Sequence, residues 1–295
     1  METILETQEL SKSYGSFQAV KKLNLKIGKG SICAFLGQNG AGKSTTIKML
    51  LGMSRPSSGT GKIFGLDINN EEQSVKIRKR TAYVAEDKRL YDYMTVEQIL
   101  RFTKYFFPLW RHDLEQKLVR MFELPSDRKI KKLSKGMRTK LALTLSLCRG
   151  CEFLILDEPT EGLDPLAIEN LLEFIVRLAG EGISIFFSSH QIAEVEQIAD
   201  HVCMIHKGSL LLDADMDTIK ENFKYVRIAF AEHEVPVHFS PQGAKSVLRD
   251  GSTISFITDK NLDGLLSNPL LLGASHVDVE PISLKDIFLS YVKSN

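Results

Sequence analysis

The sequence predicts an α/β fold built on a largely parallel β-sheet, followed by a second and smaller unit. A glycine-rich loop at residues 37–45 stands between an apolar run and a helix-like segment. All-apolar runs alternate with helix-like segments up to about residue 215, a pattern typical of parallel sheets that helices cover on both faces. Beyond about residue 220, apolar and polar residues alternate within the strands, which indicates a separate α+β unit.

Length and composition allow one large domain and one smaller one. The chain has 295 residues, of which 43% are hydrophobic and 25% charged, and its formal net charge is +1. The balanced charge gives no reason to expect nucleic acid as a partner. No apolar run approaches the roughly 20 residues that a membrane helix needs, and the acidic start lacks the form of a signal peptide. We therefore expect an intracellular protein, with any membrane-spanning part of its system on another chain.

The four cysteines are not expected to form a disulfide framework. Cys148 and Cys151 make a C-x-x-C pair, but no second pair completes a zinc site. The pair lies where a helix meets a strand, whereas a redox pair needs a helix N-terminus to lower the thiol pKa. We therefore expect these two cysteines to be inert; the other two are Cys33 and Cys203.

Residues 3–30 are expected to form short antiparallel strands, because Leu23, Leu25 and Ile27 alternate with polar residues. Tyr14 lies in a turn-like segment between these strands. It is either a surface or core aromatic or a ring that stands over the base of a bound nucleotide. Its position alone leaves both interpretations open.

The glycine-rich loop matches the Walker A pattern G-x-x-x-x-G-K-S between a strand-like run and a helix. Its glycines let backbone N–H groups turn inward, and these form an anion site with the helix N-terminus. Lys43 adds a positive charge for the β- and γ-phosphates, and Ser44 offers a hydroxyl to Mg²⁺. We expect a nucleoside triphosphate to bind at Gly37, Gln38, Asn39, Gly40, Ala41, Gly42, Lys43, Ser44 and Thr45.

The next segment begins with short α/β elements and then becomes helical. We expect a helix over 71–80, a strand over 81–84 and a loop over 85–94 that mixes charges with aromatic residues. Thr95 and Gln98 match a capping box that opens a helix towards Phe107. The block from about 95 to 150 is expected to form a helical subdomain inserted into the α/β sheet.

The remaining part of the α/β region contains three helix or strand boundaries marked by polar residues. Ser134 is a plausible N-cap of a mostly buried helix, and Asp164 precedes Pro165 at another helix start. A buried strand over 183–187 leads to His190. A hairpin over 202–212 follows. We expect the large domain to span 1–219 and the accessory domain 220–295, with strands at 225–230, 253–256 and 277–279 and a helix at 282–292.

Two carboxylates end the buried strand over 153–156, which is expected beside the strand of the glycine-rich loop. In this Walker B pattern, Asp157 would hold Mg²⁺ and Glu158 would polarise the attacking water. Adjacent strand residues normally point to opposite faces, and the Pro159 turn is what would bring both carboxylates to one site. The alternative is an acidic pair that faces solvent.

Two further features concern the phosphate end of the site. His190 is either an ordinary helix cap or a hydrogen-bond donor to the γ-phosphate. Ser134 and Gly136 place a hydroxyl and a glycine backbone at a helix N-terminus, a second anion-binding site in the same chain. One nucleotide held between two copies of the chain would explain both anion sites.

In sum the chain resembles the ATP-binding subunit of an ATP-binding cassette (ABC) transporter over about residues 3–215. The matching segments are Walker A at 37–45, the LSGGQ-like signature at 133–137, Walker B at 153–158, the D-loop at 162–165, the switch histidine His190 and the adenine-stacking aromatic Tyr14. The resemblance implies a P-loop NTPase core with an antiparallel β subdomain and a helical subdomain, plus the small C-terminal α+β unit. It also implies ATP and Mg²⁺, with Ser134 and Gly136 acting in trans.

Some residues differ from the family pattern, and they indicate which subgroup of the family the chain resembles. Glu86 occupies the position of the Q-loop glutamine, where it would ligate Mg²⁺ directly or through water. Lys135 and Met137 replace a glycine and a glutamine of the signature. Together with the C-terminal unit, this combination resembles the ABC-2-type exporter subgroup. It implies a separate integral membrane permease, a second copy or sister ATPase subunit, and a location at the cytoplasmic face of the cell membrane.

Two alternative classes of P-loop protein would have other sequence features. A soluble ABC-type ATPase of DNA repair would carry a long coiled-coil insertion, and one of translation would join two cassettes with basic surfaces. A P-loop kinase or GTPase would need neither the signature nor the D-loop. Peptides, drugs, ions and glycans all stay open as cargo, because cargo contacts would lie in the permease.

Overall fold

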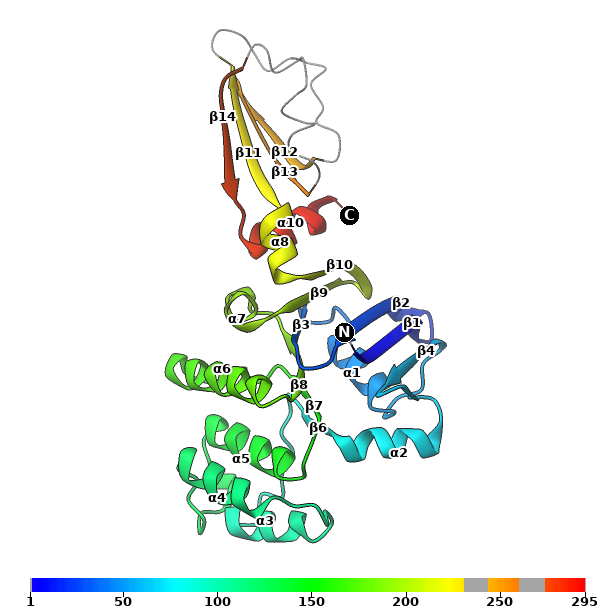
Figure 1. The fold of residues 1–295 in the computed structure, drawn as a ribbon, viewed down its shortest axis with the longest axis vertical. Coiled ribbons are helices and arrows are strands. Elements are labelled where there is room, and N and C mark those ends of the chain that lie inside the picture. The colour runs from blue at the N-terminus through cyan, green and yellow to red at the C-terminus, as the bar shows by residue number, and fades with distance from the viewer. Residues whose placement is uncertain (1, 231–243, 260–273, 295) are drawn as a thin grey trace. The chain divides into compact units, whose positions relative to one another are not determined.

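The computed structural model describes residues 2–230, 244–259 and 274–294, and they form two compact units. Unit 1 spans Met1–Asp213 and unit 2 spans Ala214–Asn295. The boundary falls before helix α8 (Met216–Asn222), whereas the boundary expected from the sequence lies after residue 219. Figure 1 shows the elements of both units.

The central sheet of unit 1 is largely parallel and has the strand order β10-β9-β3-β8-β7-β6. Its middle strands are fully buried and contain apolar runs, as expected for a sheet covered on both faces, although β7 ends in Asp157 and β8 begins and ends with serines. Phe35 and Phe186 from neighbouring strands pack with ring centroids 5.3 Å apart. The strands are β3 (Ile32–Leu36), β6 (Thr81–Val84), β7 (Phe153–Asp157), β8 (Ser184–Ser189), β9 (His201–His206) and β10 (Ser209–Asp215).

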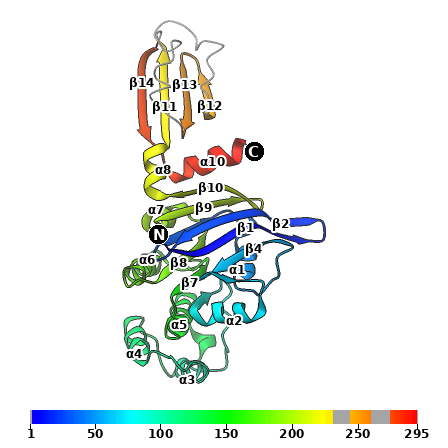
Figure 2. The same ribbon diagram turned by 45° about the vertical axis from the view of Figure 1, so that its right-hand side comes forward.

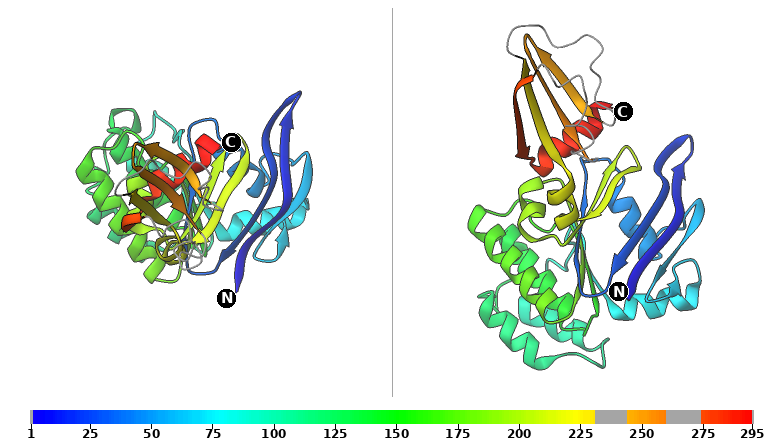
Figure 3. Two further views of the ribbon diagram at one scale, coloured as in Figure 1. Left: turned by 90° about the horizontal axis from the view of Figure 1, so that it is seen from above. Right: turned by 45° about the horizontal axis from the view of Figure 1, so that its top comes forward.

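A second, antiparallel sheet of unit 1 has the order β2-β1-β4-β5. The strands predicted to be short in 3–30 are two twelve-residue strands, β1 (Thr3–Tyr14) and β2 (Phe17–Gly28), so that expectation was wrong about their length. The sheet is completed by β4 (Ser58–Ile63) and β5 (Leu66–Asp67). Helix α1 (Lys43–Leu50) packs against both sheets, and one apolar core joins them (Figures 2 and 3).

The remaining helices of unit 1 lie on both sides of the central sheet: α2 is on the side of α1, and α5, α6 and α7 cover the other face, with α3 and α4 beside α5 (Figure 1). Thr95 makes the predicted capping box at the start of α3, and Asp164 caps α6 with Pro165 in its first turn. The block predicted as helical does contain α3, α4 and α5. The helices are α2 (Glu71–Arg80), α3 (Val96–Lys104), α4 (His112–Met121), α5 (Lys135–Leu147), α6 (Pro165–Gly180) and α7 (Ile192–Ile198), with a 3-10 turn at Ile130–Lys132.

Unit 2 has a four-stranded antiparallel sheet with the order β12-β13-β11-β14. Its core contains Val226, Ile228 and Phe256, and helix α10 buries Ile287 and Phe288. Three of its strands are predicted from the sequence, but β12 (Lys245–Asp250), most of which is exposed, is not. The other elements are β11 (Lys224–Phe230), β13 (Thr253–Thr258), β14 (Ala274–Pro281) and α10 (Leu284–Ser294).

Candidate functional site

The glycine-rich loop runs from the end of β3 to the start of α1 and is fixed by close backbone approaches. Gly37 donates its N–H to the Ser189 carbonyl at 3.1 Å. A Cβ on Gly37 would lie 2.5 Å from the carbonyl oxygen of Ile205, so no larger residue fits there. Gly42 has φ of 110° at the helix N-cap, and a Cβ there would lie 2.6 Å from the Ala19 carbonyl oxygen.

Lys43 is the buried cation of this loop, with only 5% of its side chain exposed. Its Nζ donates to the carbonyl oxygens of Gly37 at 2.6 Å and Gln38 at 3.2 Å, and it lies 3.0 Å from Glu158 Oε1. A buried ammonium beside a helix N-terminus that has no side-chain cap is chemically suited to an anion. The residues of the loop therefore fit the phosphates of a nucleotide.

Asp157 ends β7, and its carboxylate accepts two hydroxyl hydrogen bonds. Ser44 donates to Asp157 Oδ1 at 3.2 Å, and Ser188 donates to the same oxygen at 2.7 Å. The expectation that the Walker B strand lies beside the loop strand was wrong, because β8 pairs with both β3 and β7 and lies between them. Ser188 of β8 thus fills the space that separates the two motifs. A hydroxyl and a buried carboxylate at this distance suit a hard cation such as Mg²⁺.

Glu158 reaches the same site as Asp157 because its own backbone is left-handed, with φ of 46°. This conformation is costly for a residue with a Cβ, and such strain gathers at functional sites. Because of it, the Glu158 side chain does not point to the sheet face opposite to that of Asp157, as the next residue of a strand would. The chain therefore leaves the strand direction at Glu158, one residue before Pro159. Its Oε1 faces Lys43, and its Oε2 lies 2.9 Å from Nδ1 of His190. Glu158 is 4% exposed, whereas the His190 side chain is 37% exposed.

Two further residues support this cluster and were not anticipated from the sequence. Ser188 accepts the Glu158 backbone N–H at 3.0 Å, so its hydroxyl links both carboxylate residues. Ser189 donates to Glu194 Oε2 at 2.9 Å and accepts the N–H of Gln191, which holds the turn around His190. Burial raises the pKa of Glu194. The sequence pattern that could have predicted these residues is a pair of serines at the end of an apolar strand segment, followed by an acidic residue on a short helix.

The signature residues lie at the N-terminus of α5. Ser134 is the predicted N-cap and accepts the Met137 N–H at 3.2 Å, and it is exposed. Gly136 is half-buried, with Leu163 of the D-loop beside it. Lys135, the departure from the family pattern, has Nζ 3.9 Å from Glu161 Oε1.

Tyr14 and Glu86 are the two peripheral candidates. Tyr14 is 52% exposed at the tip of the β1–β2 hairpin, and the Lys12 ammonium lies 5.1 Å from its ring centre. A hydrogen bond with the Glu161 carboxyl is the main reason that the pKa of Glu86 is raised, with smaller contributions from burial and from the charges of Glu161, Asp157 and Glu158. Glu86 therefore lies within electrostatic reach of the Walker B carboxylates.

The C-x-x-C pair has the properties of inert thiols. Cys148 and Cys151 are free in the structure. Burial raises the pKa of Cys148 to about 12 and that of Cys151 to about 11. Because the thiolate is the reactive form, neither is activated at neutral pH.

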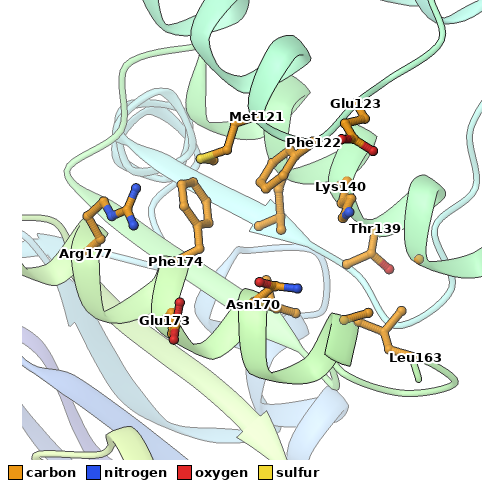
Figure 4. Close-up of a pocket in the computed structure, with 14 residues that line it drawn as sticks. Met121, Phe122, Glu123, Thr139, Lys140, Leu163, Asn170, Glu173, Phe174 and Arg177 are labelled. Atoms are coloured by element: carbon orange, nitrogen blue, oxygen red, sulfur yellow. The ribbon is translucent and has the colours of Figure 1, made fainter. Parts of the chain in front are cut away.

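A cavity of about 380 Å³ lies between α4, α5 and α6, away from the carboxylate cluster. The rings of Phe122 and Phe174 meet edge to face across it, with centroids 5.2 Å apart (Figure 4). Gly136 and Leu163 contribute to its lining, so it adjoins the signature segment. It does not contain the buried cation and carboxylates that mark the nucleotide site.

The fold and this site define an ATP-binding cassette. The family model of the ABC transporter matches residues 20–161, and the chain belongs to that family. It is an ATP-hydrolysing subunit of an ABC transporter, and it binds ATP. ATP-binding domains of this family form dimers and work with membrane permeases.

Similar proteins support this membership along most of the chain. The bacitracin transport ATP-binding protein BcrA of Bacillus licheniformis is 37% identical over 80% of this chain and 78% of its own length. The lantibiotic transport ATP-binding protein SrtF of Streptococcus pyogenes is 32% identical over 72% of this chain and 92% of its own. A solved ATP-binding subunit of an ABC transporter is 31% identical, covers 74% of this chain and 92% of its own, and superimposes with a TM-score of 0.67.

Among the helices in the described residues, none is long and apolar enough to cross a membrane.

Proposed function

We propose that two cassettes close head to tail over two ATP molecules and that this closure drives a separate permease to export its cargo. The chain would act at the cytoplasmic face of the cell membrane, held there by the permease. Unit 2, corresponding to the accessory domain expected at 220–295, is not assigned a role in this cycle. ATP works here as a ligand that favours the closed state.

The observation that carries the proposal is the contact of Glu158 with both Lys43 and His190. Lys43 would exchange its carboxylate partner for the β- and γ-phosphates. Glu158 would then be free to accept a proton from the attacking water, and His190 would hold the other Glu158 oxygen and donate to the γ-phosphate. Gly37 to Thr45 would bind the phosphates through their backbone, and Tyr14 would stack on adenine.

Ser44 and Asp157 would hold Mg²⁺, with Glu86 as a further ligand directly or through water. The ion would supply charge neutralisation at the phosphates. Ser188 would keep the Asp157 carboxylate oriented, because its hydroxyl already donates to that carboxylate.

The second half of each site would come from the other cassette. Ser134 and Gly136 stand at the start of a thirteen-residue helix, and Ser134 is exposed. A helix N-terminus of this kind favours a bound anion. In trans, Ser134 and Gly136 would contact the γ-phosphate of ATP bound to the partner cassette.

The permease would dock on an exposed aromatic surface next to the loop that contains Glu86. The rings pair from residue to residue at centroid separations of 5.1 to 6.0 Å. Exposed apolar patches of this kind mark interaction sites. This aromatic surface consists of Tyr91, Tyr93, Phe102, Tyr105 and Phe106, which are 41% to 88% exposed.

The cargo would belong to the classes expected from the sequence, namely peptides, drugs, ions or glycans. The relatives named for bacitracin and lantibiotic transport favour an antibiotic among them. A soluble ATPase of translation or DNA repair is not favoured by these relatives.

The proposal is tested by comparing ATPase activity and ATP binding of the wild type and Glu158→Gln. The variant should lose at least about 100-fold in turnover, should still bind ATP, and should accumulate as an ATP-bound dimer in size-exclusion chromatography. Glu169→Gln, on the exposed side of α6, is the matched control and should behave as wild type. Wild-type turnover in Glu158→Gln would falsify the assignment of the base. Recovery of RNA or DNA, and no permease, from the native cell would overturn the transport role.

A further inference from the structure

A second cluster of metal-ligating side chains lies near the amino ends of β3 and β9, away from the nucleotide loop at the carboxyl end of β3. Cys33 is near the start of β3, and His201 begins β9, which pairs with β3 in parallel. The nucleotide loop follows the carboxyl end of β3, so these residues lie at the edge remote from ATP. Cys203 of β9 and Asp213 of β10 complete the cluster.

The side chains of this cluster already converge. The ligand atoms of His201, Cys203 and Asp213 all lie within 4.8 Å of one another. Asp213 Oδ1 is 2.6 Å from His201 Nε2 and 3.2 Å from Cys203 Sγ. Cys33 Sγ lies 3.7 Å from Cys203 Sγ, and both thiols are fully buried. The side chains of His201 and Asp213 remain 18% and 30% exposed, which gives an ion a route from the surface.

Several of these separations are close to those of a tetrahedral zinc site, whereas Cys33 approaches only Cys203 and lies outside the group whose ligand atoms are all within 4.8 Å of one another. Zinc bonds of about 2.0–2.3 Å place neighbouring ligand atoms roughly 3.3–3.8 Å apart. The two sulfur atoms fall within this range, and Cys203 and Asp213 lie just below it. The shorter contact between His201 and Asp213 is a hydrogen bond, and it would lengthen once a metal displaced the shared proton.

The chemistry of the donors selects the ion. Thiolate and imidazole ligands suit zinc, whereas Mg²⁺ and Ca²⁺ require oxygen ligands. Without a metal, the Asp213 carboxylate could accept hydrogen bonds from both His201 and Cys203. Such a network would not need the second thiol, Cys33, beside Cys203. Among the described residues, Cys33 packs in the apolar core and the hydrogen-bond contact of its Sγ is with Cys203.

We propose that Cys203, His201 and Asp213 bind a zinc ion, and that the neighbouring Cys33 becomes the fourth ligand through a shift of its side chain towards the metal. Binding would release the thiol protons to solvent and join β3, β9 and β10 through the metal. The ion would stabilise the folded sheet rather than take part in ATP hydrolysis. This inference does not depend on the proposed transport cycle.

The test titrates nucleotide-free, chelator-treated protein with Co²⁺ and then with Zn²⁺. Wild-type protein should give the visible absorption of tetrahedral cobalt and a near-ultraviolet thiolate-to-cobalt band, and both should disappear as Zn²⁺ replaces Co²⁺. Thermal unfolding should shift to higher temperature with Zn²⁺. Absence of these cobalt bands in the wild type would overturn the proposal.

Variants locate the ion. Asp213→Asn should weaken metal binding at least about tenfold. Because Asp213 is exposed, this variant should still fold even if substitutions of the buried cysteines do not. Cys203→Ser should abolish the thiolate band or leave only a weak one, and Cys33→Ser should reduce it. Cys148→Ala is the control and should bind cobalt as the wild type does. An unchanged affinity in Asp213→Asn, or an unchanged band in Cys203→Ser, would contradict the assignment.

Discussion

Glu158 Oε2 lies 2.9 Å from Nδ1 of His190, although the two residues come from the ends of different strands. The contact depends on the left-handed backbone of Glu158 and on the position of β8 beside β7. Glu158 is buried while His190 is half-exposed, so a ligand can approach the histidine from solvent without disturbing the carboxylate.

His190→Gln should reduce ATP turnover by roughly 100-fold, the usual effect of losing one oriented hydrogen-bond donor. ATP affinity should change little, because the phosphates are held mainly by the loop and Lys43. The measurement is steady-state ATPase activity together with nucleotide binding. His112→Gln, at the exposed start of α4, is the control. Equal losses of affinity and turnover would show that His190 acts in ground-state binding instead.

Ser188→Ala should destabilise the protein by about 1–3 kcal/mol, because it leaves the buried Glu158 N–H and one Asp157 oxygen with fewer hydrogen bonds. We also expect a higher Mg²⁺ concentration for half-maximal ATPase activity, since Asp157 loses an orienting donor. Urea unfolding and a Mg²⁺ titration measure the two effects. An unchanged Mg²⁺ midpoint would contradict the proposed link between Ser188 and the ion.

Ser134→Asp should retain the helix cap, because aspartate caps helices as well as serine does. It should nevertheless lose most turnover, because its charge would repel the γ-phosphate of the partner's ATP. Binding of ATP to the isolated cassette should stay near the wild-type value. Mixing Ser134→Asp with Lys43→Ala protein should restore part of the activity, since one site of each mixed dimer would then be intact. No recovery on mixing would argue against a site shared between two chains.

Glu194→Gln should change how stability depends on pH. Burial raises the pKa of Glu194 above 4.5, so the folded state binds more protons than the unfolded state as the pH rises from that value. The carboxylate therefore costs stability at neutral pH and none below about pH 4.5. The variant should unfold at a higher temperature near pH 7, and this gain should vanish on acidification. Glu196→Gln, exposed on the same helix, is the control, and a gain that persists below pH 4.5 would exclude this explanation.

Local signals in the sequence predicted much of the fold. Thr95, Ser134 and Asp164 each mark a helix start through a cap that forms within three residues, and the structure contains all three caps. Strand β12 was missed because Lys245–Asp250 is largely exposed and has no apolar alternation.

The arrangement of the site was harder to predict because it depends on strand order. Because β8 lies between β3 and β7, Ser188 stands between the glycine-rich loop and the carboxylates that end β7. No local sequence pattern predicts that Ser188 lies there. The left-handed turn at Glu158 is likewise set by its tertiary surroundings. The cluster of Cys33 with His201 joins residues from distant segments, so spacing rules for zinc motifs did not detect it.

The aromatic surface also affects how the cell must produce this subunit. Tyr105 is 88% exposed, and the neighbouring Phe106 is 60% exposed. Rings this accessible bind other apolar surfaces without selectivity, so surplus copies would self-associate or be captured by chaperones. Synthesis of the subunit in a fixed ratio to whatever covers these rings therefore favours a soluble, functional population over aggregates.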